Sequence, residues 1–201
     1  MYKVESDFEY KGYRCVTTFN DMGFRCGYVG LPEGHPLYNV GYDDKIEATF
    51  DNIEGQSLGK RSPSTLIECV GLESEDKISA GLYFNVHGGL TYSDGGKGSE
   101  YPVLSDLWWF GFDCGHYNDL EDIATLKELW GDDNKGKMII QMKEDMNAKF
   151  PELKANSVVR TVEYVQNECR SLVDQIIAYC TRYENGYFRK VIKLEDYKKG
   201  V

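Results

Sequence analysis

The sequence predicts an α+β fold, in which an antiparallel sheet from the N-terminal half is packed by a long C-terminal amphipathic helix and one or two shorter helices. Alternating residues and hairpin-type turns fill the first part of the chain, and an apolar stripe at helical spacing runs through residues 157–183. Strands come before helices instead of alternating with them, which is the α+β order. We expect a single domain over 1–201, with 1–115 mainly β, 116–186 mainly helical and 187–201 a closing strand and tail.

Strands are predicted from alternation, β-branched residues and turn chemistry. Residues 21–23 form a hairpin turn in which Gly23 can take a positive φ, and Lys11-Gly12 joins an earlier short strand to the same meander. The expected strands are 8–10, 13–20, 24–31, 65–72, 78–93 with a break at a Gly-Gly pair, 107–115 and 187–197, while 45–53 is a strand or a short helix.

Helices are predicted at 119–131, 135–150 and 157–183. Asp119 is the expected N-cap of the first, Gly131 ends it, and Pro151 stops the second. Asn156 or Ser157 can cap the third. The third helix has the longest apolar stripe, formed by Val158, Val162, Val165, Cys169, Leu172, Ile176 and Cys180.

Composition limits the classes of partner. Lys and Arg number 23 and Asp and Glu number 33, so the net charge is −10, which disfavours direct binding to nucleic acid and suits a basic protein partner. The six cysteines contain no CxxC pair. The N-terminus has no apolar leader and no apolar run approaches 18 residues, so we expect a cytoplasmic protein with free thiols and no membrane contact.

The three histidines, His35, His87 and His116, all lie beside loop signals. With Asp113 they could ligate a metal, but no HExxH or HxH spacing is present, so we expect neither a metal nor another cofactor. His87, Asp113 and His116 are the candidate catalytic residues, as acid, base or ligand. Cys114 lies among aromatic residues, which predicts a buried structural thiol rather than a nucleophile.

The segment WWFGFDCGHY, residues 108–117, is expected to be a strand with two different faces. Trp108, Phe110, Phe112 and Cys114 share the core face, and Trp109 and Asp113 share the other, with His116 nearby. Residues 88–100 are expected to form a mobile Gly-rich surface loop. The expected ligand- or partner-binding residues are His35, His87, Gly88, Gly89, Trp109, Asp113 and His116.

Four blocks carry a resemblance: GYRCVTTFNDMGFRCGYVGLPEGHPLY, VHGGLTYSDGG, LWWFGFDCGHYND and RTVEYVQNECRSLVDQI. They resemble an uncharacterised family of small cytosolic proteins of bacteriophages and prophages. The resemblance implies an accessory phage product, and such products often counter host defence. The resemblance implies no catalytic role for any residue. The motif positions that it covers are His35, His87, Trp108, Trp109, Phe112, Asp113, Cys114 and His116.

Three functions follow as expectations. The first is a phage-encoded, non-catalytic, anti-CRISPR-like counter-defence protein that inhibits a host immune effector, such as a nuclease, through acidic segments 73–76 and 121–133. The second is a sponge for a nucleotide signal, in which the Trp108-Trp109 region stacks a base and His87 with the Gly88-Gly89 turn meets phosphate. The third is a small hydrolase.

These expectations differ in what the fold must supply. The sponge needs a deep pocket, and the hydrolase needs at least two histidines converging with Asp113. The inhibitor needs a broad acidic or tyrosine-rich surface. The sequence does not predict the oligomeric state.

Overall fold

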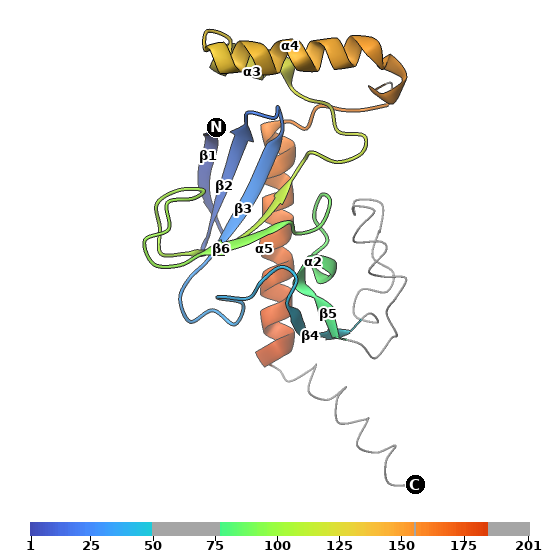
Figure 1. Ribbon diagram of the computed structural model, residues 1–201. Helices are drawn as coiled ribbons and strands as arrows, with labels where there is room; N and C mark the ends of the chain where they lie inside the picture. Colours follow the sequence, from blue (N-terminus) through green and yellow to red (C-terminus); the bar gives the residue numbers. More distant parts are fainter. Residues whose placement is uncertain (50–76, 155, 185–201) are drawn as a thin grey trace.

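The computed structural model describes residues 1–49, 77–154 and 156–184 (Figure 1). Its elements are β1 (Tyr2–Tyr10), β2 (Tyr13–Asn20), β3 (Arg25–Leu31), β4 (Lys45–Thr49), β5 (Lys77–Ser79), α2 (Ala80–Tyr83), β6 (Tyr92–Gly95), β7 (Trp108–Asp113), α3 (Ile123–Trp130), α4 (Asn134–Lys149), the 3₁₀ helix η3 (Pro151–Lys154) and α5 (Val162–Glu184). The expected strands 65–72 and 187–197 lie outside the described residues. No helix in the described part of the chain is long and apolar enough to cross a bilayer.

The main sheet is antiparallel and has the strand order β1-β2-β3-β7-β6, so the α+β prediction is confirmed. The predicted β2–β3 hairpin is present, and Gly23 has a φ of +88° in its turn. Strand β1 is longer than the three residues expected, and its register shifts at a bulge between Val4 and Ser6. β4 and β5 form a separate two-stranded sheet.

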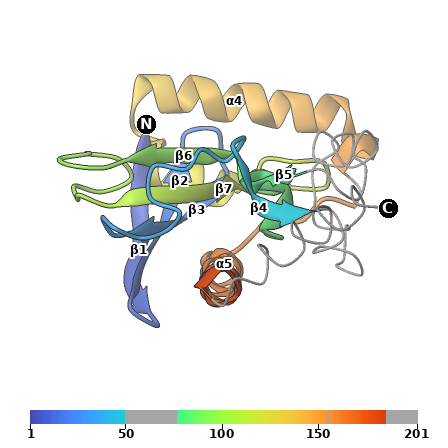
Figure 2. The ribbon, with the colours of Figure 1, turned by 90° about the horizontal axis from the view of Figure 1, so that it is seen from below.

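Helix α5 covers one face of the main sheet, as both views show (Figures 1 and 2). The predicted stripe is buried at Val165, Cys169, Leu172 and Ile176. The helix begins at Val162 rather than at 157, because Val158 pairs with Asp119 in a parallel bridge. The hydroxyl of Thr161 then accepts a hydrogen bond from the Tyr164 N–H in the first turn, and so takes the capping role expected of Asn156 or Ser157.

The two faces of β7 separate as predicted. Phe110, Phe112 and Cys114 are buried in the core beneath α5, and Trp108 packs against the same core. Trp109 points to the opposite face, where it is fully buried in a second cluster with Val16 and Tyr28. Partly buried residues of the β6–β7 connection, Tyr101, Val103 and Leu107, pack against this cluster. Trp109 is therefore a core residue and not a surface for stacking a base.

Two local predictions were wrong because side chains make hydrogen bonds that the sequence pattern did not indicate. Residues 80–83 form the short helix α2 instead of a strand, since the Ser79 hydroxyl caps the Leu82 N–H. The N-cap of α3 is Asp122 and not Asp119. Helices α3 and α4 lie across the end of the sheet where β2 ends, held there by a cluster around Phe19 (Figure 1).

Arg25 connects this end of the sheet to the helical half. Its guanidinium donates to both carboxylate oxygens of Glu5, at 2.9 and 3.1 Å, and to Asp122 at 2.9 Å. A fourth bond, of 2.9 Å, reaches the main-chain carbonyl of Arg160, just before α5. One buried cation thus ties together β1, β3, α3 and the segment that leads into α5.

The carboxyl of Asp122 predicts acid sensitivity. Burial alone would raise its pKa, but hydrogen bonds from Thr125 and Arg25 hold the pKa below the usual 3.8. A carboxyl with a depressed pKa stabilises the fold above its unfolded pKa and loses that contribution as the pH falls through the folded value. We expect urea titrations to give a free energy of unfolding that declines from about pH 5 downward. Asp122→Asn should show a shallower decline than the parent, and equal slopes would contradict this assignment.

Candidate functional site

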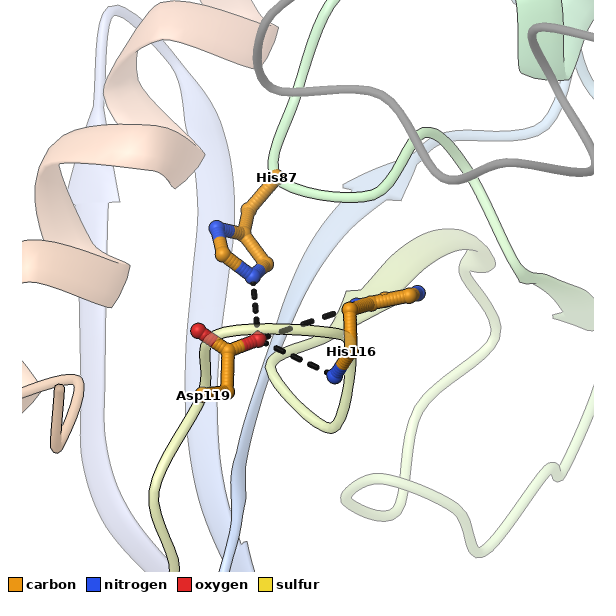
Figure 3. A group of neighbouring side chains, drawn as sticks. All are labelled: His87, His116 and Asp119. Atoms are coloured by element: carbon orange, nitrogen blue, oxygen red, sulfur yellow. Dashed lines mark hydrogen bonds and ion pairs between the residues drawn. The ribbon is translucent and has the colours of Figure 1, made fainter. Parts of the chain in front are cut away.

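The candidate site lies where β7 leaves the sheet, and three segments distant in sequence meet there. His87 lies in the turn after α2, and His116 and Asp119 lie in the turn after β7. Arg160 and Tyr164 come from the segment entering α5 and from its first turn. Figure 3 shows the His87 imidazole directed toward the Asp119 carboxylate, whereas the His116 ring extends away from it with one ring nitrogen on the nearer side. One ligand atom from each of His87, His116 and Asp119 lies within 4.8 Å of the others.

The Asp119 side chain is fully buried and is the centre of the site. Its Oδ2 accepts from His87 Nε2 at 2.6 Å and from the main-chain N–H of His116 at 3.0 Å. Its Oδ1 accepts from Arg160 Nε at 2.7 Å. Burial would raise the pKa of Asp119, yet these hydrogen bonds from His87, Arg160 and His116 hold it below its usual value. Asp119 is therefore an ionised carboxylate at neutral pH.

His87 is held on all sides. Its main-chain N–H donates to Glu168 at 3.0 Å, and its Nδ1 lies 3.0 Å from the Tyr164 hydroxyl. In the tautomer with the proton on Nε2, this atom donates to Asp119 and Nδ1 accepts from the Tyr164 hydroxyl. Burial, and then the nearby Glu168, raise the pKa of Tyr164 to about 12, so its hydroxyl keeps its proton.

His116 differs from His87 because its Nδ1 is buried and has no hydrogen-bond partner among the described residues. This atom lies 3.8 Å from Asp113 Oδ1 and 3.9 Å from Asp119 Oδ2, beyond hydrogen-bonding distance of either. The ring centres of His87 and His116 are 5.5 Å apart. Burying a polar atom without a hydrogen-bond partner lowers the free energy of unfolding by about 1–3 kcal/mol. A ligand that binds this nitrogen would remove that cost.

The expected site residues have different places in the structure. His87 and His116 come together, but the carboxylate between them is Asp119, which the sequence analysis assigned to a helix cap. Asp113 lies at the edge of the site, where its oxygens accept from Thr91 and from the Gly115 N–H. It therefore shapes the turn that carries His116.

His35 belongs to a different part of the molecule. Its Nε2 lies near the Tyr13 hydroxyl and the Cys180 thiol, and its Nδ1 accepts from the Leu37 N–H. Cys180 follows Tyr164 by 16 residues on α5, which corresponds to about 24 Å along the helix axis. The three histidines therefore do not form one site.

Local geometry supports neither a nucleophilic Cys114 nor a phosphate-binding Gly-Gly turn. Burial, and then the nearby Asp119, raise the pKa of the Cys114 thiol, which fits the expected structural role. In the Gly-Gly turn the N–H of Gly89 donates to the Val86 carbonyl, so it is not available to a phosphate. Gly88 instead permits close approach of the His116 ring.

Gly88 gives a direct test of how His116 is seated. Its φ is +73°, and an added Cβ would lie 2.7 Å from His116 Nδ1. Gly88→Ala should therefore displace the imidazole and lower the free energy of unfolding by about 2–3 kcal/mol, from strain and overpacking. The change is measured by urea unfolding and by the imidazole NMR signals of His116.

The matched control is Gly98→Ala. Gly98 has a φ of +74°, but no atom lies within 4 Å of an added Cβ, so this variant has the backbone strain without the clash. Equal losses in the two variants would show that contact with His116 contributes nothing.

Comparison with protein-family models, with curated proteins and with solved structures finds no match to this chain. Function must therefore be inferred from the site itself. Sequence reasoning missed Asp119, Arg160, Tyr164 and Glu168. The short spacing between His116 and Asp119 is the one local feature of the sequence that could have indicated this site. The other residues come from distant segments and meet only in the folded chain.

Proposed function

We propose that the protein is a metal-dependent hydrolase whose divalent cation is held by His87, His116 and Asp119. The observation that carries this proposal is the convergence of one ligand atom from each of these residues within 4.8 Å. The buried Nδ1 of His116, which has no hydrogen-bond partner among the described residues, adds to it. Zn–N and Zn–O bonds are about 2.0–2.2 Å long, so small side-chain movements would let one ion bridge this group. The proposal replaces the expectation that the chain binds no metal.

The ligand set favours a catalytic rather than a structural ion. Structural zinc sites have four protein ligands, whereas catalytic sites have three and leave a position for water. Two imidazoles and one carboxylate also suit zinc better than calcium or magnesium. When bound, such a cation lowers the pKa of water to about 7 and polarises a carbonyl or phosphoryl oxygen. Two histidines converging with a carboxylate was the requirement for the hydrolase expectation, with Asp119 in the place expected for Asp113.

The surroundings of His87 suit this role. To offer Nε2 to a cation, the neutral ring must carry its proton on Nδ1, which would then donate to the Tyr164 oxygen. A hydroxyl can reverse from donor to acceptor, so Tyr164 satisfies His87 in both tautomers. Arg160 and the His116 N–H likewise hold the carboxylate of Asp119 in place. Such outer partners orient metal ligands and strengthen binding.

Zinc titration of the full chain tests the proposal. We expect isothermal titration calorimetry to show one zinc ion per chain, and His116→Ala to bind it at least about 100-fold more weakly. His35→Ala is the control, because His35 lies at the other end of α5 and should leave zinc affinity unchanged. Absence of stoichiometric binding, or equal affinity in His116→Ala, would refute the metal site.

The structure gives the nucleotide-sponge alternative little support for base stacking. Trp109 is fully buried, and the partly buried Trp108 packs against the core and donates to the Val40 carbonyl. The counter-defence inhibitor stays a prediction, and one feature favours protein binding. Met138, Met142 and Met146 recur every four residues on α4 and are 68, 50 and 55% exposed. Methionine-rich faces adapt to protein partners. Within the expected acidic surface, by contrast, Glu121 and Asp122 pair internally with Lys143 and Arg25.

A purified host nuclease effector would test this second candidate. Inhibition that Met142→Glu abolishes, with zinc affinity unchanged, would assign it to α4. Inhibition lost in His116→Ala but kept in Met142→Glu would assign it to the histidine site instead.

A further inference from the structure

Arg160 is the cation beside the proposed metal site, and its guanidinium hydrogen-bonds to Asp119 through Nε. The guanidinium carbon lies 4.9 Å from the centre of the Tyr164 ring. No hydrogen bond joins its two terminal nitrogens to another residue in the described ranges, and 26% of the side chain is exposed. Arg160 is therefore held firmly at Nε and by the ring, with its terminal N–H groups open to a further partner.

The charges around Arg160 determine when that partner can bind. Asp119 is bonded to Arg160, and Asp113, whose side chain is 38% exposed, lies 3.8 Å from His116. Without a metal ion these two carboxylates outweigh Arg160, so an anion is not favoured. A divalent cation on His87, His116 and Asp119 reverses the local sign and places positive charge on both sides of an incoming group.

We propose that the site takes a phosphate ester, with the phosphoryl group lying between the bound cation and the terminal N–H groups of Arg160. This inference rests on the proposed metal site. The planar pair of terminal nitrogens matches two oxygens of a phosphoryl group, and arginine together with a metal ion is a recurring clamp for phosphoryl transfer.

The reaction implied is hydrolysis of the ester. The oxygen of water joins phosphorus, the ester P–O bond breaks, and the departing oxygen leaves as an alcohol after taking one proton from the water. The net change is the addition of one water molecule, and no oxidant or reductant is needed.

A small phosphate ester fits the molecule better than a nucleic-acid strand does. The chain carries a net charge of −10, which repels a polyanion over the whole surface. Arg160 with one divalent ion is sufficient for a single phosphoryl group, whereas tracking a strand requires a basic groove.

Calorimetry with inorganic phosphate as the probe tests the inference on the zinc-loaded chain and on chelator-treated chain. We expect binding only in the zinc-loaded form, and a loss of about 10- to 100-fold in Arg160→Gln, which removes the charge-assisted bonds. Arg160→Lys keeps the positive charge but lacks the paired terminal N–H groups, so its phosphate affinity should lie between those of the parent and Arg160→Gln. Arg14→Gln, on the exposed β1–β2 pair, is the control and should match the parent.

Zinc affinity and thermal unfolding are measured on every variant, so the two proposals can fail separately. Zinc binding without phosphate binding, or equal phosphate affinity in the parent and Arg160→Gln, would overturn the phosphate inference while the metal site stands. Failure to bind zinc would overturn both. The substrates p-nitrophenyl phosphate and p-nitrophenyl acetate are compared on zinc-saturated protein. Loss of the bond to Asp119 should lower the activity of Arg160→Gln toward both esters, and loss of the terminal N–H groups should lower it further toward the phosphate ester alone. Equal losses on both would count against a phosphoryl clamp.

Discussion

Arg25→Met is expected to lower the free energy of unfolding by about 3–5 kcal/mol, the usual cost of removing one partner from a buried ion pair. The Arg25 side chain is 8% exposed, and Glu5 and Asp122 are 14 and 16% exposed. Removing the guanidinium leaves both carboxylates poorly solvated and the Arg160 carbonyl without this donor. Urea unfolding at neutral pH measures the loss.

Arg14→Met is the comparison for this prediction. Arg14 also makes a two-point contact with Asp7, but both side chains are 37% exposed. Exposed pairs contribute about 0–1 kcal/mol, so this variant should unfold nearly as the parent does. If Arg25→Met cost no more than Arg14→Met, then Arg25 would not be the link between the sheet and the helical half.

Asp119→Asn is expected to damage both the fold and the site. An amide cannot accept at both positions where the carboxylate now does, so its NH₂ group would face either the Arg160 Nε–H or the N–H donors of His87 and His116. We expect the free energy of unfolding to fall by about 3 kcal/mol and zinc affinity to fall by at least about 100-fold. Urea unfolding and zinc calorimetry on the same preparation measure the two effects.

Asp113→Asn separates the two carboxylates. Asp113 is at the edge of the site and its side chain is 38% exposed, so its loss of charge should cost under about 1 kcal/mol and change zinc affinity only a few-fold. A larger loss of zinc affinity in Asp113→Asn than in Asp119→Asn would mean that the sequence-based choice of Asp113 was the better one.

Local patterns predicted the elements that depend on local chemistry. The hairpin around Gly23, the two faces of β7 and the stripe of α5 all follow from turn residues and from side-chain periodicity. The predictions failed where a residue interacts with a distant segment of the chain instead of with its sequence neighbours. Val158 continues the helical stripe in sequence, but its backbone pairs with Asp119. Asp119 has the sequence of a cap, but its carboxylate binds His87 and Arg160.

The site could be predicted only in part for the same reason. The sequence analysis identified His87 and His116 as candidate catalytic residues beside loops. Their spacing in the sequence does not show that they lie close together in the fold, or that His35 lies elsewhere. The contact depends on Gly88 lying against the His116 ring and on α5 supplying Tyr164 and Glu168 to His87. These partners are as far as 81 residues from His87 in the chain, so their relation exists only in the folded protein.

The bulge in β1 has a consequence for association between molecules. As an edge strand, β1 presents main-chain groups that could template pairing with a strand of another chain, the first step toward fibrils. The register shift between Val4 and Ser6 interrupts that row, and Lys3, Asp7 and Glu9 place exposed charges along it. Growth of the sheet by addition of further β1 strands is thereby disfavoured, and the long edge can stay open to solvent without promoting aggregation.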